Sequence, residues 1–293
     1  MLLSRIRKHL PGYLFLVPAL IVFGLFSWYP IIQGLLLSFR KWTAEESTFV
    51  GLDNFRFVLS DPVFAIAWKN TVMFVVLGLL FGYLVPLVMA ITMNEMRRLK
   101  GFLRVAYYLP SVLPGVVVIM LWKWIYDPAV GVLNMLLKLL HMQPSMWYQN
   151  STTVIPSLVL MSIWTFAGST ALIYLAALQN IPGYLYESAE LDGAGPLQKL
   201  WHITLPQVRG VMLVILVLQI IGTTQTFVEP LVMTAGGPNN ASMTVMLLIY
   251  RYAFQYYNFG AAAAAGLILF VVLVLFSLLY FWLTRKVGSA DGT

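Results

Sequence analysis

Neutral polar side chains recur along one face of an apolar segment near the middle of the chain. Ser162, Thr165, Phe166 and Ser169 stand at the helical spacing i, i+3, i+4 and i+7, and Trp164 lies beside them. Polar groups are costly in hydrocarbon, so in a membrane helix they usually face a cavity or another helix. Hydroxyl groups near aromatic rings suit a polyol, because a ring can lie against the C–H face of a sugar. Hydrogen bonds between helices are the alternative explanation.

The next apolar segment carries a second polar face. Gln219, Thr223 and Thr226 share one side of a helix, with Thr224 and Gln225 adjacent. Neither segment has an acid or a base in its middle, so an ion or a permanently charged solute fits poorly. The two faces together predict a binding cavity. Its predicted substrate contacts are Ser162, Trp164, Thr165, Phe166, Ser169, Gln219, Thr223 and Gln225.

The sequence carries no set of residues arranged for catalysis. It has no cysteine, and His9, His141 and His202 are too far apart to share a metal ion. The pattern G-x-x-x-x-G-K-[ST] is absent, so nucleotide binding through a P-loop is not expected. Glu229, near the end of the fifth segment, is interpreted as solvated rather than as a gate or rim residue. We therefore expect no enzyme activity, no metal, no cofactor and no nucleic-acid surface in this chain.

Composition predicts that long helices hold these residues within a membrane. The 293-residue chain is 60% hydrophobic and 10% charged, which is far outside the range of soluble domains. A spanning helix needs about 20 apolar residues. The prediction is an all-α membrane protein, one transmembrane domain over residues 1–293. Its six spans are predicted at residues 13–38, 68–93, 105–126, 153–178, 208–231 and 260–283. Residues 243–252 are apolar but short, and are predicted to form an interfacial helix.

The distribution of basic residues predicts the orientation of these spans. With the N-terminus in the cytoplasm, 11 of the 18 Lys and Arg residues lie on the cytoplasmic side and 7 on the other. The cluster at residues 97–104 and the pair Arg285-Lys286 decide the direction. Both termini are therefore predicted to be cytoplasmic, with the basic segment 1–9 leading into a retained first span rather than a cleaved signal peptide.

A stretch of mixed polarity at residues 181–206 interrupts the apolar segments. It contains two helix-length pieces, residues 184–191 and 196–201, joined at Asp192-Gly193-Ala194-Gly195. Helices this short are not stable alone in water, so the stretch is predicted to dock onto another surface. Gly193 is predicted to make a tight turn with a positive φ angle.

Residues 187–206 follow the spacing E-x-A-x-x-D-G-x9-I-x-L-P. This pattern resembles the coupling loop of the permease subunits of binding-protein-dependent ABC importers, where the loop sits in a cleft of the partner ATPase. Ser188 departs from the family's E-A-A form but is also small. The resemblance implies ATPase-coupling roles for Glu187, Ser188, Ala189, Asp192, Gly193, Ala194, Ile203, Leu205 and Pro206.

Further motifs extend this resemblance over nearly the whole chain and resemble the carbohydrate-uptake branch of the family. They are Val50-Gly-Leu-Asp-Asn-Phe55, Asn70-Thr71, Arg104 with Leu109-Pro110 and Trp122, Gly131-Val-Leu-Asn134, and Thr234-Ala-Gly-Gly-Pro-Asn239 leading to Tyr250 and Phe254.

The resemblance implies the type I ABC importer permease (MetI-like) fold and a place in the bacterial cytoplasmic membrane. The expected partners are the lipid bilayer, a second homologous permease, two ATPase subunits that bind ATP and Mg²⁺, and an extracytoplasmic solute-binding protein. The expected function is translocation of a sugar or oligosaccharide by alternating access. Glycerol-3-phosphate or another polyol is an alternative solute. A secondary transporter that works alone is a further alternative, but it would need ionisable residues in mid-span.

Overall fold

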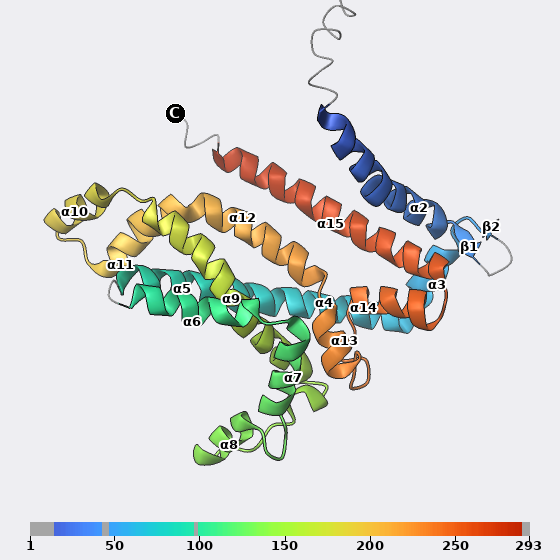
Figure 1. Cartoon of the computed structure of the whole chain (residues 1–293), viewed down its shortest axis with the longest axis horizontal. Coiled ribbons are helices and arrows are strands. Elements are labelled where there is room, and N and C mark those ends of the chain that lie inside the picture. The colour runs from blue at the N-terminus through green and yellow to red at the C-terminus, as the bar shows by residue number, and fades with distance from the viewer. Residues whose placement is uncertain (1–14, 43–46, 97–98, 289–293) are drawn as a thin grey trace, which may run out of the picture. The chain divides into compact units, whose positions relative to one another are not determined.

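The computed structural model describes residues 15–42, 47–96 and 99–288, which form helices and one short hairpin (Figure 1). The predicted basic segment at residues 1–9, together with His9, Arg97 and Arg98, lies outside the described residues. The chain divides into two compact units. Unit 1 comprises Met1–Asp61 and Ile249–Val274, and unit 2 comprises Pro62–Leu248 and Leu275–Thr293.

Unit 1 joins an apolar helix to a small polar cap. The helix Phe15–Ser38 includes a π-helical turn and leads into an antiparallel hairpin in which Arg40 pairs with Phe49. The elements of this unit are η1 (Gly24–Trp28), α2 (Tyr29–Ser38), β1 (Arg40–Trp42), β2 (Ser47–Phe49), α3 (Asp53–Ser60), η5 (Arg251–Gln255) and the first part of α15 (Phe259–Gly288).

Unit 2 contains most of the helices. They are α4 (Pro62–Leu77), η2 (Gly78–Tyr83), α5 (Leu84–Glu95), α6 (Lys100–Val112), α7 (Gly115–Ile125), α8 (Val132–Leu139), η3 (Trp147–Gln149), α9 (Val154–Gln179), α10 (Gly183–Leu191), α11 (Pro196–Lys199), η4 (Leu200–Thr204), α12 (Leu205–Thr224) and α13 (Val228–Thr234). The short helix α14 (Val245–Tyr250) falls where residues 243–252 were predicted to be helical, and it crosses from unit 2 into unit 1.

Helix α9 is the central element of unit 2 and packs against α5, α6, α12 and η2. One apolar cluster surrounds its first half, around Leu158 and Met161, and a second surrounds its last turns, around Tyr174 and Leu175. These four side chains are almost completely buried. The two clusters therefore pack α9 against its neighbours along both halves of its length.

The closest approach in this bundle occurs at Gly168 of α9. A Cβ atom built there would lie 1.8 Å from the carbonyl oxygen of Tyr107 in α6, so only glycine fits. Small residues at helix contacts are typical of membrane bundles because they let two backbones approach closely. The glycine thus fixes α6 against the middle of α9.

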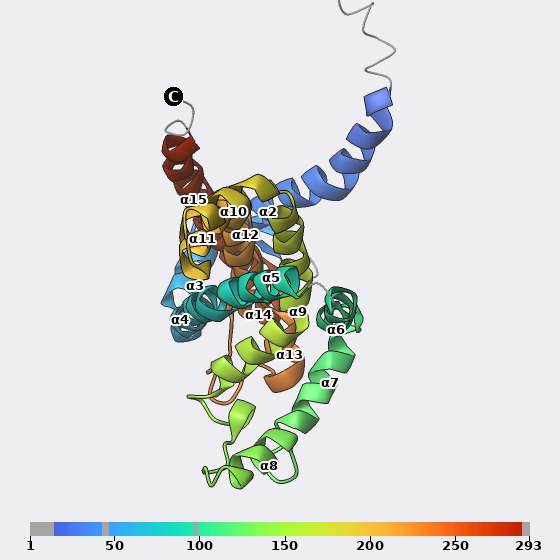
Figure 2. The ribbon, with the colours of Figure 1, turned by 90° about the vertical axis from the view of Figure 1, so that its left-hand side faces the viewer.

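The predicted third span at residues 105–126 is not one continuous helix, which corrects the sequence-based expectation. Helices α6 and α7 meet at a bend of 99°. Figure 2 shows α6 end-on with α7 leaving it downward. The cause is Pro114, because the residue before a proline is driven to extended geometry. Leu113 accordingly has ψ 143°, and the helix stops.

Five helices of the described chain are long and apolar enough to cross a membrane, and the bent pair α6–α7 makes up to six. The five are Phe15–Ser38, Pro62–Glu95, Val154–Gln179, Pro196–Thr234 and Phe259–Trp282. The fifth predicted span, at residues 208–231, is longer than expected. It begins at Pro196, because α11 continues through η4 into α12.

Three asparagines from the motifs that extend the family resemblance, Asn54, Asn70 and Asn134, tie separate segments together through their side-chain amides. Asn54 donates to the carbonyls of Ser38 and Arg40, at 3.0 and 2.9 Å, within unit 1. Asn70 donates to the carbonyls of Asn240 and Met243, at 2.8 and 3.0 Å, within unit 2. Buried backbone carbonyls need such partners.

Asn134 ties together the loops around α8 in the same way. Its amide nitrogen donates to the carbonyls of Pro128 and Ser145, and its amide oxygen accepts from the Trp147 indole N–H at 2.9 Å. These asparagine motifs are therefore architectural.

The close contact at Gly168 gives a direct test of the bundle. Gly168→Ala should destabilise the protein by about 1–3 kcal/mol, because an added methyl group must push α6 away from α9. Gly210→Ala is the matched control, since nothing lies within 4 Å of a Cβ on that helical glycine. The measurement is the thermal unfolding midpoint in detergent. Equal midpoints for the two variants would show that α6 does not approach α9 as described.

Candidate functional site

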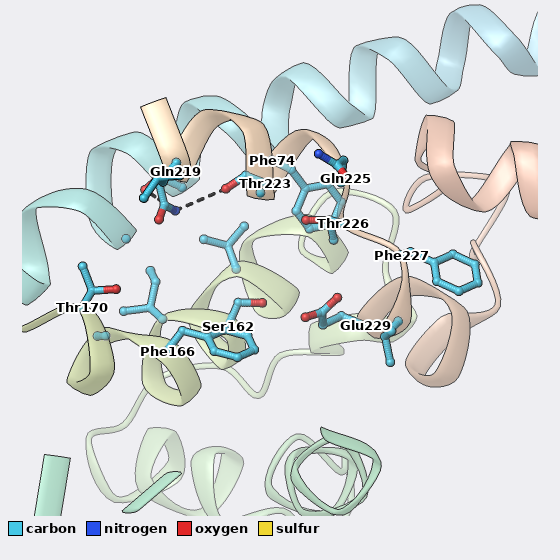
Figure 3. Close-up of a pocket in the computed structure, with 18 of the residues that line it drawn as sticks. Phe74, Ser162, Phe166, Thr170, Gln219, Thr223, Gln225, Thr226, Phe227 and Glu229 are labelled. Atoms are coloured by element: carbon cyan, nitrogen blue, oxygen red, sulfur yellow. Dashed lines mark hydrogen bonds between the residues drawn. The ribbon is translucent and has the colours of Figure 1, made fainter. Parts of the chain in front are cut away.

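A cavity of about 520 Å³ lies within unit 2, lined by residues of α4, η2, α9, α12, α13 and α14 (Figure 3). Its polar lining comes from Ser162, Thr170, Gln219, Thr223, Gln225, Thr226 and Glu229. Apolar and aromatic side chains, including Phe74 and Phe166, form the rest of the wall. A mostly apolar pocket with a few convergent polar groups is the usual form of a small-molecule site, and this volume lies within the usual range.

Two glycines allow the second and fifth spans to approach each other beside this cavity. A Cβ atom on Gly82 would lie 3.0 Å from Nε2 of Gln219, and one on Gly78 would lie 3.3 Å from the Thr223 side chain. Gln219 donates to Oγ1 of Thr223 at 3.2 Å. The amide of Gln219 is therefore held at the cavity wall by its neighbours.

Five of the eight predicted substrate contacts belong to the cavity lining: Ser162, Phe166, Gln219, Thr223 and Gln225. The other three, Trp164, Thr165 and Ser169, are not in it. Thr165 is buried and donates to the Met161 carbonyl at 2.8 Å, while Ser169 donates to the Phe166 carbonyl at 2.8 Å. Both hydroxyls thus bond their own helix.

Trp164 lies on a different side of α9. It lines a separate apolar cavity of about 580 Å³, and its ring meets Trp122 edge-on at 5.8 Å between centroids. The cavity face of α9 instead runs through Val159, Ser162, Phe166 and Thr170. At 3.6 residues per turn, this face is rotated by about 55° from the predicted stripe. Thr170 was missed because the predicted stripe ended at Ser169.

Glu229 also lines the cavity, which corrects its interpretation as a solvated residue. The helix breaks between α12 and α13, at Gln225–Phe227, and Glu229 stands in the first turn of α13. Figure 3 shows its carboxylate turned toward the cavity. The polar residues at the break were the sequence signal that could have located it.

The segment between α9 and α12 has a rigid internal structure. Gly193 has φ +77°, as predicted, and the turn is closed by Ala194 N–H donating to the Ala189 carbonyl at 2.8 Å. Nζ of Lys199 lies 2.6 Å from Oε1 of Glu190, which joins α11 to α10. The hydrogen bond from Lys199 lowers the pKa of Glu190, so this carboxylate is ionised at neutral pH.

The predicted coupling residues divide between surface and bundle. Glu187, Ser188, Asp192 and Gly193 are exposed, whereas Ala189, Ala194, Ile203 and Leu205 are half-buried. Leu205 packs against the apolar cluster around the end of α9, and Pro206 stands at the start of α12. The second helix-length piece is not separate, because it continues into α12. The exposed tip also presents Leu191 and Leu197, with 90% and 67% of their surface exposed.

Residues 78–289 match the family described as "Binding-protein-dependent transport system inner membrane component". The chain belongs to this family.

Individual relatives agree with this assignment over nearly the full length. The permease is 35% identical to the "Probable ABC transporter permease protein YurN" of Bacillus subtilis, over 93% of this chain and 95% of that protein. It is 30% identical to the "Arabinooligosaccharides transport system permease protein AraP" of Halalkalibacterium halodurans, over 97% and 90%.

A solved structure shares the fold of the permease. A chain of a bacterial ABC transporter involved in the import of the acidic polysaccharide alginate matches it with a TM-score of 0.86 and 28% sequence identity. The match covers 97% of this chain and 98% of that one. The permease therefore has the type I importer (MetI-like) fold and is a membrane-embedded, non-catalytic subunit of an ABC transporter.

The turn at Gly193 generates a prediction about the exposed segment. Gly193→Ala should loosen the joint between α10 and α11, because an alanine at positive φ costs roughly 1 kcal/mol or more. Gly183→Ala is the control, since a Cβ there also meets nothing within 4 Å and its φ is not positive. Hydrogen exchange of residues 183–199 should increase only for Gly193→Ala. Equal exchange in the two variants would contradict the rigid turn.

Proposed function

We propose that the permease carries a neutral sugar or oligosaccharide through the α9–α12 cavity by alternating access. The observation that carries this proposal is the cavity lining, in which hydroxyl and amide groups face a space bordered by Phe74 and Phe166. Such groups can donate to and accept from sugar hydroxyls, and the rings can lie against C–H faces. The name of the AraP relative, which refers to arabinooligosaccharides, supports the same class of solute.

The charge of the lining favours a neutral solute over an anionic one. Glu229 contributes a carboxylate, and no Lys, Arg or His is among the described lining residues. Two like charges within one partly dehydrated cavity repel each other. Glycerol-3-phosphate, the alternative solute, would meet this repulsion without a compensating cation from this chain. The lining therefore favours sugars and uncharged polyols.

Transport would be driven by partner subunits that bind ATP and Mg²⁺, with no cofactor in the permease itself. We propose a complex of this chain with a second homologous permease, two ATPase subunits and an extracytoplasmic solute-binding protein. The family description and the ABC relatives support this composition. A secondary transporter working alone would need no docking segment, whereas the rigid α10–α11 segment presents exposed apolar side chains that suit a partner surface.

In this proposal the α10–α11 segment enters the ATPase with both termini of the permease in the cytoplasm of a bacterium. Glu187 offers an exposed carboxylate, and the Lys199–Glu190 ion pair keeps the two short helices together. Because α11 continues into α12, a movement of the segment is passed directly to Gln219 and Thr223. Differential contact in the two states is what makes such coupling thermodynamically possible.

Removing hydrogen-bonding groups from the cavity tests the proposed function. Gln219→Leu and Ser162→Val should each weaken transport by about 1–3 kcal/mol, because substrate hydroxyls are left unpaired. The measurements are uptake and sugar-stimulated ATP hydrolysis by the assembled transporter. Thr165→Val and Ser169→Val are the controls, since both hydroxyls lie outside the cavity lining. Wild-type behaviour of both cavity variants would show that the solute does not use this wall.

The carboxylate of Glu229 gives a second prediction. Glu229→Gln should reduce the preference for a neutral sugar over its uronate by about tenfold, because one repulsive charge is removed and tenfold corresponds to 1.4 kcal/mol. Glu229→Asp keeps the charge and should keep the preference. The measurement is binding of both sugars to the purified transporter without its solute-binding protein. If the ratio of the two binding affinities is the same in Glu229→Gln as in the wild type, the charge of Glu229 has no role in selecting the solute.

A further inference from the structure

Two cations converge on one amide where α9 ends. Lys100 and Arg104 are one turn apart on α6, and Gln179 is the last residue of α9. When the Gln179 amide is oriented with its oxygen toward the two cations, that oxygen accepts a hydrogen bond from Nζ of Lys100 at 2.8 Å and one from Nη2 of Arg104 at 3.0 Å. Helices α6 and α9 pack against each other, which brings the two cations beside the end of α9.

The cluster has more positive charge than its protein partners neutralise. Neither cation takes part in the ion pairs Arg56–Asp53 and Lys199–Glu190. A lysine ammonium has three N–H donors and an arginine guanidinium has five, while Gln179 supplies one shared neutral oxygen. The Gln179 oxygen therefore cannot satisfy all of these donors, and an anion beside them would be stabilised.

A mainly apolar cavity adjoins Arg104. Its volume is about 400 Å³, and Arg104 and Gln179 line it together with Val105, Tyr108 and Leu172. The polar groups come from the α6–α9 cluster, and the other walls are mainly aliphatic. A phosphate next to an aliphatic chain is the arrangement found in a phospholipid, and a free phosphate has no use for the apolar wall.

The position of the cluster also matches a lipid headgroup, if the orientation proposed above is correct. Gln179 immediately precedes the α10–α11 segment, so the cluster would lie where the bundle meets the cytoplasm. The cytoplasmic leaflet carries anionic lipids, and basic pockets between transmembrane helices on that side bind their headgroups.

We propose that Lys100, Arg104 and Gln179 bind the phosphate of an anionic phospholipid whose acyl chain lies in the adjoining cavity. The lipid joins α6 to the end of α9, directly beside the segment that would meet the ATPase. The amount of anionic lipid in the membrane would then affect how firmly this end of the bundle is held.

Native mass spectrometry of the full-length permease, purified with its accompanying subunits, tests this site. Wild-type protein should retain phosphatidylglycerol in preference to phosphatidylcholine. Arg104→Gln should lower the retained phosphatidylglycerol about tenfold, because a charge-assisted hydrogen bond is lost. Arg209→Gln is the control, since it removes the same charge from an exposed position on α12. Arg104→Lys should restore part of the binding.

Three outcomes would overturn the proposal: equal retention of the two lipids, equal losses in Arg104→Gln and Arg209→Gln, or displacement of the lipid by inorganic phosphate. The orientation is measured separately with Gln198→Cys, which is possible because the chain has no cysteine of its own. Labelling of that cysteine from outside intact cells would refute the orientation. If it is not labelled and the wild-type protein retains phosphatidylglycerol and phosphatidylcholine equally, the lipid site alone is refuted.

Discussion

The contact between Gly168 and the carbonyl of Tyr107 is the constraint on which the rest of unit 2 depends. It brings α6 against the middle of α9, and this fixes the rotation of α9 about its own axis. With α9 fixed, Ser162 and Thr170 face the cavity, while Trp164 faces a separate apolar space. The same contact places the cations of α6 beside Gln179. Close packing of glycine therefore determines which polar groups can meet a solute.

The helical segments and the turn between α10 and α11 could be predicted from the sequence because both depend on local patterns. Runs of about 20 apolar residues locate spans without reference to their neighbours. The positive φ of Gly193 follows from its place in a short turn. The bend between α6 and α7 was missed, although Pro114 was visible, because a proline inside an apolar run is often accommodated by neighbouring helices.

The composition of the cavity could be predicted only in part, because helix rotation is decided by tertiary packing. Thr165 and Ser169 share a helical face with Ser162, and all three hydroxyls donate to carbonyls of their own helix, so only the rotation of α9 decides which of them lines the cavity. Glu229 was misread because its direction depends on the break at Gln225–Phe227, and the polar residues there signal a break without fixing where the following side chain points. The basic cluster at Gln179 depends on the packing of two helices far apart in the sequence.

The central claim is that the solute passes along the face of α9 that carries Ser162. Ser162→Cys introduces the only cysteine of this chain, so its reaction with a small thiol reagent can be followed by mass in the assembled, reconstituted transporter. The account predicts that the sugar that stimulates ATP hydrolysis slows modification of Ser162→Cys. The same sugar should leave Ser169→Cys unaffected. Equal rates for Ser162→Cys with and without that sugar would contradict the claim.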